Sequence, residues 1–333
     1  MDVLVSDVAF DRFRDRLHAV EGVGWLVMDG AGEIRAGGLG PSVAWEHAAP
    51  EVAFGTYDLF HTGASRRFLG FVKRCESIRW FQSPAAGFEN PFFAEVVRRG
   101  IRLTTGHGTA VAISEYILRS VLDAFQEAQR WRDAAAKHEW TRPAHRFREV
   151  AGSTWLIVGV GAIGSETARR AQAFGAHVIG VRRHPSGAEP VDRMIGPAQL
   201  AAVVGEADVL VLAAPATAAT AHLVDADLLA RMRPGSVLVN VARGALVDEA
   251  ALLAALDAGA PGAAVLDVTE EEPLAPDSPL WMHPAVTITP HAAGRSVATN
   301  DRLLPTFLEN LRRYRAGEPL LNERTPADLE EPA

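Results

Sequence analysis

Short, continuous apolar runs recur along the chain, and between them lie longer segments whose apolar positions repeat with helical spacing. Continuous apolar runs are typical of strands that are buried on both faces of a sheet. The segments between the runs are long enough to carry the chain back across such a sheet as helices. The pattern therefore predicts an α/β protein built on parallel sheets.

The part of the chain before Thr105 contains up to five such runs. Strands are expected at residues 3–6, 25–28, 52–57, 78–82 and 101–104, and helices at 11–20, 65–75 and 91–99. The fourth strand leads into a loop of small residues, Ser83 to Phe88, at a carboxyl end, where open α/β sheets bind ligands. We expect this part to form a small α/β domain of its own.

A longer helical signal follows at residues 109–137. Helices of this length commonly join domains. Residues 137–149 then place His138, Trp140, His145 and Phe147 among charges, which indicates an arm or loop rather than a regular element. Such an arm could pack on a second subunit.

The second half of the chain keeps the alternation. Strands are expected at residues 154–158, 177–181, 209–213, 236–241, 263–268 and 286–288, and helices at 165–174, 225–232, 249–258 and 302–315. This order is typical of a doubly wound sheet. Asp225 is a suitable N-cap for its helix, which Pro234 and Gly235 would end.

Three glycines spaced GxGxxG end the apolar run that begins at Thr154. Gly159 can make the tight turn, Gly161 lets the backbone approach a pyrophosphate, and Gly164 allows the helix to pack closely on the strand. A GxGxxG alone is weak evidence, but here a helix and a second buried strand complete a βαβ unit. The segment predicts a dinucleotide site with the phosphates on free amides at the helix N-terminus.

The residue that ends the second strand of this unit bears on the choice of cofactor. An acidic side chain there would accept a hydrogen bond from the ribose 2′-hydroxyl of NAD. This chain has Arg182, followed by Arg183 and His184, with no carboxylate before Glu189. Because these cations suit a 2′-phosphate, we expect NADP to be preferred. The alternative is an NAD enzyme in which the arginines form a solvated turn.

Composition limits the other classes of function. The chain has 333 residues and 48% apolar content, enough for two domains, and its net charge of −8 argues against nucleic-acid binding. No apolar run reaches the ~18 residues of a membrane span. Cys75 has no disulfide partner, and the N-terminus lacks a signal-peptide pattern, so a cytoplasmic location is expected. His138 and His145 lack metal-ligand spacing, and no metal is expected.

Three residues suited to chemistry stand just past the ends of the later strands. Arg243 lies in an Asn-x-Ala-Arg-Gly segment, Glu272 precedes Pro-Leu, and His291 follows Thr-Pro. Each alone is ordinary, because an arginine before glycine is usually a surface charge, a glutamate run a solvated turn, and a histidine after proline part of a loop. Their order behind a GxGxxG makes the set specific.

With these motifs the sequence resembles the D-isomer-specific 2-hydroxyacid dehydrogenase family over nearly the whole chain, most strongly from about residue 150 to residue 296. The resemblance implies a Rossmann dinucleotide-binding domain, residues 105–295, inserted into a smaller flavodoxin-like substrate domain, residues 1–104 and 296–333. Both would have doubly wound parallel sheets, and the two would close on the ligand. It also implies a homodimer formed through residues 111–147.

The implied roles are those that hydride chemistry requires. Reduction of a 2-oxo acid needs a proton donor at the carbonyl oxygen as the hydride arrives, which a protonated His291 can be. Glu272 would stabilise the imidazolium and fix its orientation, while Arg243 would hold the substrate carboxylate and polarise the carbonyl. By resemblance, the amides of Ala86 and Gly87 make a second carboxylate contact.

The resemblance also assigns the cofactor contacts. The amides of Ala162 and Ile163 would meet the pyrophosphate, and Asp267 would face the nicotinamide carboxamide. The full expected set is Gly159, Gly161, Ala162, Ile163, Gly164, Arg182, Arg183, Pro215, Val241, Ala242, Arg243, Asp267, His291 and Ala293.

Two departures from the family pattern bear on function. Arg182 replaces the usual acidic residue, as in NADP-using reductases of glyoxylate and hydroxypyruvate, and Phe88 and Glu89 stand where Val and Asp are usual. We therefore expect an NADP-dependent reductase of the glyoxylate/hydroxypyruvate type. A phosphite-type dehydrogenase and a non-enzymatic, dinucleotide-sensing corepressor-like protein stay open. Formate dehydrogenases pair their histidine with glutamine, so Glu272 counts against them.

Overall fold

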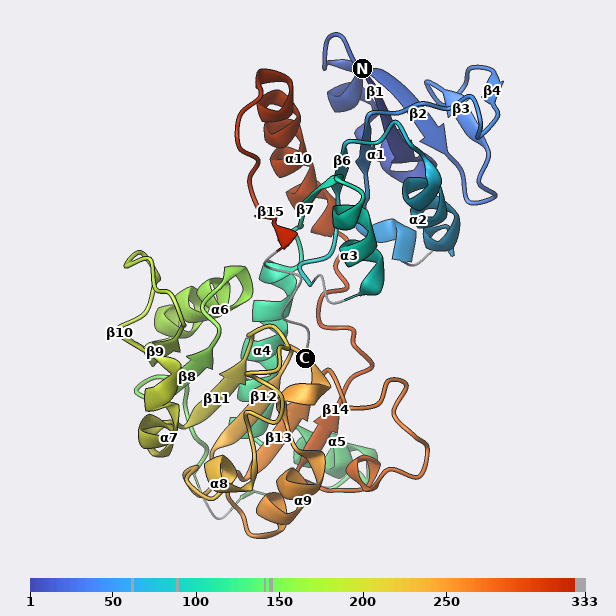
Figure 1. Ribbon diagram of the computed structural model, residues 1–333. Helices are drawn as coiled ribbons and strands as arrows, with labels where there is room; N and C mark the ends of the chain where they lie inside the picture. The colour runs from blue at the N-terminus through green and yellow to red at the C-terminus, as the bar shows by residue number, and fades with distance from the viewer. Residues whose placement is uncertain (61–62, 88–89, 141, 144–145, 327–333) are drawn as a thin grey trace. The chain divides into compact units, whose positions relative to one another are not determined.

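The computed structural model describes residues 1–326 apart from 61–62, 88–89, 141 and 144–145. The chain divides into two compact units. One comprises Met1–Thr109 and the chain from Ser296 onward, and the other comprises Ala110–Arg295. Each unit is built around one sheet, as Figure 1 shows.

The sheet of the first unit is parallel at its centre and antiparallel at its edges. Its strand order is β15-β7-β6-β5-β1-β2-β3-β4, in which β3, β4 and β15 are the antiparallel members. The strands are β1 (Asp2–Ser6), β2 (Gly24–Met28), β3 (Ile34–Ala36), β4 (Ser42–Val43), β5 (Val52–Phe54), β6 (Trp80–Gln82), β7 (Arg102–Thr104) and β15 (Glu323–Arg324). The sequence did not predict the three edge strands. The expected strand at 52–57 was too long, because Tyr57 begins a 3₁₀ turn, η1 (Tyr57–Phe60).

Helices cover both faces of this sheet. One face packs against α1 (Asp7–His18) and α10 (Thr299–Ala316), and the other against α2 (Ser65–Arg74) and α3 (Pro91–Arg98). Helix α1 begins before the expected residue 11, because the Ser6 side chain accepts a hydrogen bond from the Ala9 amide and caps the earlier turn. On α10, Phe307 stacks on Phe54 with ring centroids 3.9 Å apart. Helix α10 thus completes the core of the N-terminal sheet.

The sheet of the second unit is parallel throughout. Its strand order is β10-β9-β8-β11-β12-β13-β14, with the direction of winding reversing between β8 and β11. The strands are β8 (Thr154–Val158), β9 (His177–Val181), β10 (Arg193–Ile195), β11 (Val209–Leu212), β12 (Val237–Asn240), β13 (Ala263–Leu266) and β14 (Val286–Ile288). A reversal of this kind opens a crevice at the carboxyl ends of the strands, where doubly wound sheets bind ligands.

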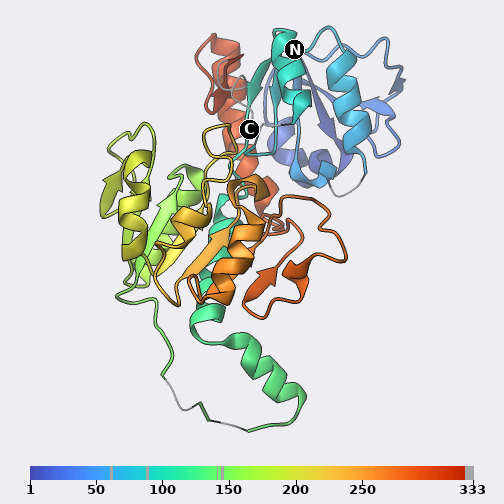
Figure 2. The same ribbon diagram turned by 60° about the horizontal axis from the view of Figure 1, so that its bottom comes forward.

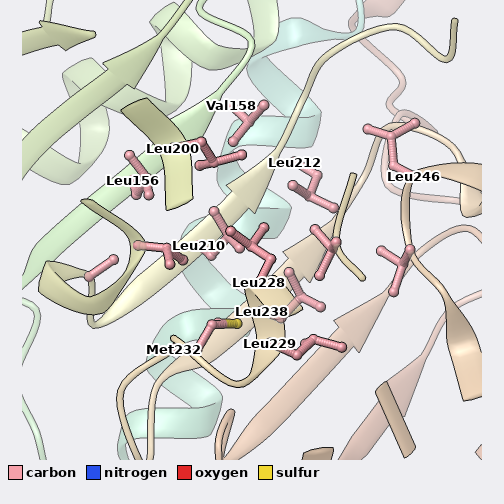
Figure 3. Packing of buried hydrophobic residues seen from close by; sticks show 14 of the residues in the cluster. Leu156, Val158, Leu200, Leu210, Leu212, Leu228, Leu229, Met232, Leu238 and Leu246 are labelled. Carbon is pink, nitrogen blue, oxygen red and sulfur yellow. The ribbon is translucent and has the colours of Figure 1, made fainter. Parts of the chain in front are cut away.

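Both faces of this second sheet are apolar, as parallel strands require. Along β8, Leu156 and Val158 join the cluster shown in Figure 3, whereas Trp155 and Ile157 pack on the opposite side with α4 (Ala110–Phe125) and α6 (Ala162–Ala173). The helices and 3₁₀ turns of the unit other than α5 are α4 (Ala110–Phe125), α6 (Ala162–Ala173), α7 (Leu200–Val203), α8 (Ala226–Leu229), α9 (Glu249–Asp257), η2 (Pro197–Gln199), η3 (Val204–Glu206), η4 (Gly244–Leu246) and η5 (Pro279–Trp281). Asp225 caps α8 as predicted, by accepting from the Leu228 amide.

The single long helix expected at 109–137 is wrong. It is two helices, α4 and α5 (Ala128–Ala136), separated at Glu127, whose φ of 52° is left-handed. No residue of α5 is buried, and Figure 2 shows α5 projecting away from the sheet of its unit. Residues 144–145, including His145, lie outside the described part of the arm that follows.

Candidate active site

The three glycines lie in the turn between β8 and α6. Gly159 has a φ of 95°, and a Cβ there would stand 2.5 Å from the Ala214 amide nitrogen. A Cβ on Gly164 would stand 2.1 Å from the carbonyl oxygen of Gly159, so α6 can approach the turn only with glycine at this position. A Cβ on Gly161 would meet nothing within 4 Å. The backbone above the turn is therefore open to a ligand.

The first turn of α6 has no side-chain cap. Gly161 is its N-cap, and Ala162 and Ile163 are its first two residues, whose amides have no partner within the helix. Free amides and the positive end of a helix of 12 residues suit a pyrophosphate. The residues present thus fit the phosphates of a dinucleotide.

The other expected cofactor residues follow the neighbouring strands. Pro215 comes after β11, Val241 and Ala242 directly after β12, and Asp267 directly after β13. Since all these strands are parallel to β8, their carboxyl ends lie along the same edge of the sheet as the glycine turn. Val241, Ala242 and Ala293 are buried and apolar, as the walls of a cofactor site commonly are.

Arg182 follows β9 on the other side of the glycine turn. Its Nη1 donates to the Glu189 carboxylate and to the carbonyl oxygen of Val160, 3.4 Å away. Glu189 also accepts from the amide and hydroxyl of Ser186, at 2.7 and 2.8 Å, and from the Gly187 amide at 2.9 Å. These donors, Ser186 foremost, lower the pKa of Glu189 to about 2. The Glu189 carboxylate thus makes these hydrogen bonds within its own loop. Arg183, which follows Arg182 in the chain, is exposed.

Arg243 is placed by the turn that follows β12. The fully buried Asn240 side chain donates to the Arg243 carbonyl oxygen at 2.8 Å and accepts from the Ala242 amide at 3.0 Å. A Cβ on Gly244 would stand only 1.9 Å from the carbonyl carbon of Thr269. Glycine at this position therefore allows the Arg243 turn to lie against the loop that carries Glu272.

His291 and Glu272 are brought together. His291 Nδ1 and Glu272 Oε2 are 2.8 Å apart, and the two side chains are 52% and 40% exposed. Because a carboxylate only accepts hydrogen bonds, Nδ1 carries the hydrogen, and Nε2 is the ring atom left to deliver or take a proton. The pair has the chemistry of a general acid with an orienting carboxylate.

Asp267 holds the loop that carries His291. Its carboxylate accepts from the Thr289 hydroxyl at 2.6 Å and from the amides of Ala292 and Ala293 at 2.8 to 3.1 Å. His291 itself has a left-handed φ of 49°, and its amide donates to the Asp267 carbonyl oxygen. Sequence reasoning assigned Asp267 only to the carboxamide of the cofactor. It missed this positioning role, which no local pattern signals.

Tyr116 is a further residue that sequence reasoning missed. Its hydroxyl lies 2.7 Å from the Thr289 hydroxyl. Since Thr289 donates its one hydrogen to Asp267, Tyr116 must donate to Thr289. Burial raises the pKa of Tyr116, which keeps it a donor. A chain of hydrogen bonds thus runs from α4 to the His291 loop.

Ala86 and Gly87 belong to the first unit, in the loop after β6. The Ser83 hydroxyl accepts from the Ala85 amide at 3.1 Å and holds the start of the loop. Among the residues that the structure describes, none accepts a hydrogen bond from the amides of Ala86 and Gly87. That these amides bind a substrate carboxylate stays a prediction. Phe88 and Glu89 lie outside the described residues.

Two kinds of feature are absent from the described residues. No three His, Cys, Asp or Glu side chains among them are grouped as metal ligands. None of their helices is both long and apolar enough to cross a bilayer.

A family model described as D-isomer specific 2-hydroxyacid dehydrogenase, NAD binding domain, matches residues 118–293, more than half of the chain. The chain belongs to this family. The resemblance inferred from its motifs is therefore confirmed, as is the fold of two parallel-sheet α/β domains. As a 2-hydroxyacid dehydrogenase, the protein is an NAD(P)-dependent oxidoreductase that binds a nicotinamide dinucleotide.

Similar proteins differ in their substrates. An (S)-sulfolactate dehydrogenase of Chromohalobacter salexigens is 37% identical over 210 residues, 62% of this chain and 67% of that protein. A glyoxylate reductase of Korarchaeum cryptofilum is 34% identical over 244 residues, 70% of this chain and 72% of that protein. A Xanthobacter autotrophicus family member solved in complex with NADPH and MES is 28% identical with a TM-score of 0.74, covering 98% of each chain. Relatives of this dehydrogenase are thus named for different substrates, sulfolactate and glyoxylate.

Proposed function

We propose that the protein reduces a small 2-oxo acid of the glyoxylate/hydroxypyruvate type to the D-2-hydroxy acid, with NADPH as its preferred cofactor. The observation that carries this proposal is the 2.8 Å contact between His291 and Glu272 beside the Arg243 turn. A bound NADPH would supply the hydride. The residues of the chain supply the proton, the anion site and the orientation.

In this proposal His291 transfers a proton from Nε2 to the carbonyl oxygen of the substrate. Glu272 accepts the hydrogen bond from Nδ1, which fixes the plane of the ring and stabilises the imidazolium. Arg243 binds the carboxylate of the substrate, a role suited to a planar guanidinium that stays charged. The amides of Ala86 and Gly87 are proposed to bind the same carboxylate. In the oxidative direction His291 takes the proton back.

The preference for NADPH is proposed on the chemistry of the loop after β9. The loop contains two carboxylates, Glu189 and Asp192. Glu189 is committed to Arg182, Ser186 and Gly187, and Asp192 accepts from the Val178 amide near the start of β9, so neither is available to a ribose 2′-hydroxyl. Arg182 and Arg183 remain as cations suited to a 2′-phosphate. Loss of charge-assisted bonds to a phosphate costs roughly 1.5 to 3 kcal/mol. We therefore expect Arg182→Asp to weaken NADPH binding by about one to two orders of magnitude.

A substrate panel tests the proposal. Glyoxylate, hydroxypyruvate, 3-sulfopyruvate and 3-phosphohydroxypyruvate should be assayed for reduction with NADPH and with NADH, and phosphite for oxidation with NADP and NAD. The highest kcat/KM is expected for glyoxylate or hydroxypyruvate with NADPH. A higher kcat/KM for a sulfonated or phosphorylated acid, or for phosphite, would contradict the substrate assignment. An equal or higher kcat/KM with NADH would contradict the cofactor assignment.

We also propose that the protein is a homodimer formed through α4, α5 and the arm that follows them. Helix α5 buries none of its residues within its own unit, and the Trp140 side chain is 94% exposed. The Trp131 and Phe147 rings meet edge to face, with centroids 5.6 Å apart. Aromatic residues on a projecting arm are typical of a surface that a second subunit covers.

A further inference from the structure

Glu189 is the feature of the cofactor unit that the proposed function leaves unexplained. Its side chain is only 4% exposed, although it lies in a surface loop whose neighbours are exposed. Both carboxylate oxygens are used, because Oε1 accepts from Arg182 and Ser186 while Oε2 accepts from Gly187. The loop of residues 182–189 therefore folds around the Glu189 carboxylate, which lies inside it.

The contacts of Arg182 determine which of its donors are left. Nη1 carries two hydrogens, and the structure gives it two acceptors, the Glu189 carboxylate and the Val160 carbonyl oxygen in the glycine turn. Among the described residues, nothing accepts a hydrogen bond from Nε or Nη2 of Arg182. These two atoms form one edge of the planar guanidinium, the fork that binds carboxylates and phosphates through two parallel hydrogen bonds.

We propose that Glu189 is a positioning residue for cofactor selection: it holds Nη1 of Arg182 and thereby presents the Nε and Nη2 edge to the 2′-phosphate of NADPH. This inference rests on the proposed preference for NADPH. Tying one end of a long, flexible side chain removes rotamer freedom before the ligand arrives, so less entropy is lost on binding. The hydrogen bond from Nη1 to the Val160 carbonyl oxygen fixes the position of the Arg182 guanidinium relative to the glycine turn.

The negative charge of Glu189 does not oppose this role. The carboxylate is enclosed by Arg182, by the Ser186 hydroxyl and by the amides of Ser186 and Gly187, so its charge is largely satisfied within the loop. A bare carboxylate at the same distance would repel a phosphate. If Glu189 positions Arg182, removing its charge weakens NADPH binding. If its charge repels the phosphate, removing it strengthens NADPH binding, so an experiment can separate the two effects.

The test measures dissociation constants by titration calorimetry for NADPH, NADH, adenosine 2′,5′-bisphosphate and 5′-AMP. Glu189→Gln is expected to weaken NADPH and the bisphosphate by about threefold to tenfold, the size of one lost hydrogen bond, and to change NADH and 5′-AMP by less than about twofold. Glu189→Asp keeps the charge but is one methylene too short, so it should weaken the same two ligands. Glu206→Gln is the matched control, because Glu206 pairs with Arg193 on the surface of the same unit.

A double-mutant cycle with Arg182→Met completes the test, since a residue that acts through Arg182 has no effect once the guanidinium is removed. Tighter NADPH binding by Glu189→Gln, equal weakening of NADPH and NADH, or an undiminished effect in the Arg182→Met background would each overturn the inference. If Arg182→Met weakens NADPH and Glu189→Gln does not, this inference alone fails. If wild type binds NADPH and NADH equally and Arg182→Met leaves both dissociation constants unchanged, the proposed preference for NADPH and this inference both fail.

Discussion

At the scale of single residues, the contact between His291 and Glu272 gives the most direct test of the site. Glu272 accepts the hydrogen bond from Nδ1 of His291 and so fixes the plane of the ring. Glu272→Gln removes the charge of this partner, and we expect kcat to fall by no more than about tenfold with KM nearly unchanged, because both side chains are about half exposed. The measurement is kcat and KM for the best 2-oxo acid at one fixed pH.

Glu271→Gln is the matched control for this prediction, because it removes a neighbouring exposed carboxylate that does not contact His291. Its kcat should match that of wild type. His291→Ala should lower kcat by about 100- to 10,000-fold, the usual size of general-acid loss, with NADPH binding nearly intact. An unchanged kcat in Glu272→Gln would show that Glu272 does not act on His291.

Tyr314 gives a pH-dependent prediction, at high pH. Burial and a hydrogen bond to Glu51 raise the pKa of Tyr314 to about 12 from an ordinary value of 10.0. The neutral phenol is therefore favoured in the folded state. The stabilisation of the folded state by the neutral Tyr314 phenol is fully present below pH 10 and is lost as pH rises towards 12.

An alkaline titration of tyrosinate absorbance checks this prediction, since the chain has only three tyrosines. Tyr314→Phe should remove one late-titrating group and reduce the fall in melting temperature between pH 10 and pH 12. Glu51→Gln should let Tyr314 ionise at lower pH. A titration that Tyr314→Phe leaves unchanged would refute the assignment.

Single residues also show where sequence reasoning reaches its limit at the site. Arg243, Glu272 and His291 were named because they follow strands of a parallel sheet, and such ends share one edge. The roles of Tyr116 and Asp267 could not be predicted. They depend on hydrogen bonds to Thr289, which directly follows β14, and Tyr116 reaches it from α4. No spacing along the chain encodes how α4 packs on the sheet.

At the scale of elements, Gly244 controls how closely two loops approach. A methyl group there would overlap the Thr269 carbonyl group and the Glu270 nitrogen, with contacts of 1.9 to 2.3 Å. Gly244→Ala must therefore push the Arg243 turn away from the Glu272 loop. We expect a loss of about 1 to 3 kcal/mol in the free energy of unfolding, as in other overpacked sites, and a lower kcat/KM.

Gly196→Ala is the control for this change, because its Cβ would meet nothing nearer than the Gln199 Oε1 at 4.0 Å. It should keep both the melting temperature and kcat/KM. If Gly244→Ala matched this control in both measurements, the close approach of the two loops would not matter for activity.

The elements themselves were predictable to different degrees. Buried strands such as β11 and β12 were located from their apolar runs, since both faces of a parallel sheet are covered. The hairpin of β3 and β4 was missed because strands of three and two residues are too short for a period to show. The break at Glu127 was missed because Gln126, Glu127 and Ala128 all favour helix, so no local pattern marks the end of α4.

At the scale of the whole molecule, the proposed dimer can be tested without any assay of activity. Light scattering at micromolar concentration should give twice the mass of 35.7 kDa. Trp131→Glu should favour the monomer by placing a charge on α5, whereas Trp281→Glu, which changes an exposed tryptophan outside the arm, should leave the dimer intact. A monomeric wild type would contradict the proposal.

The α10 helix has a consequence for how the protein is made. The second unit is continuous in sequence, from Ala110 to Arg295, so it can finish folding as soon as it leaves the ribosome. The first unit is synthesised earlier but must wait, because Phe307 and Leu311 of α10 cover the face formed by Phe54 and Trp80. Until α10 emerges, the nascent chain exposes this aromatic face, which makes it a candidate for chaperone binding during translation.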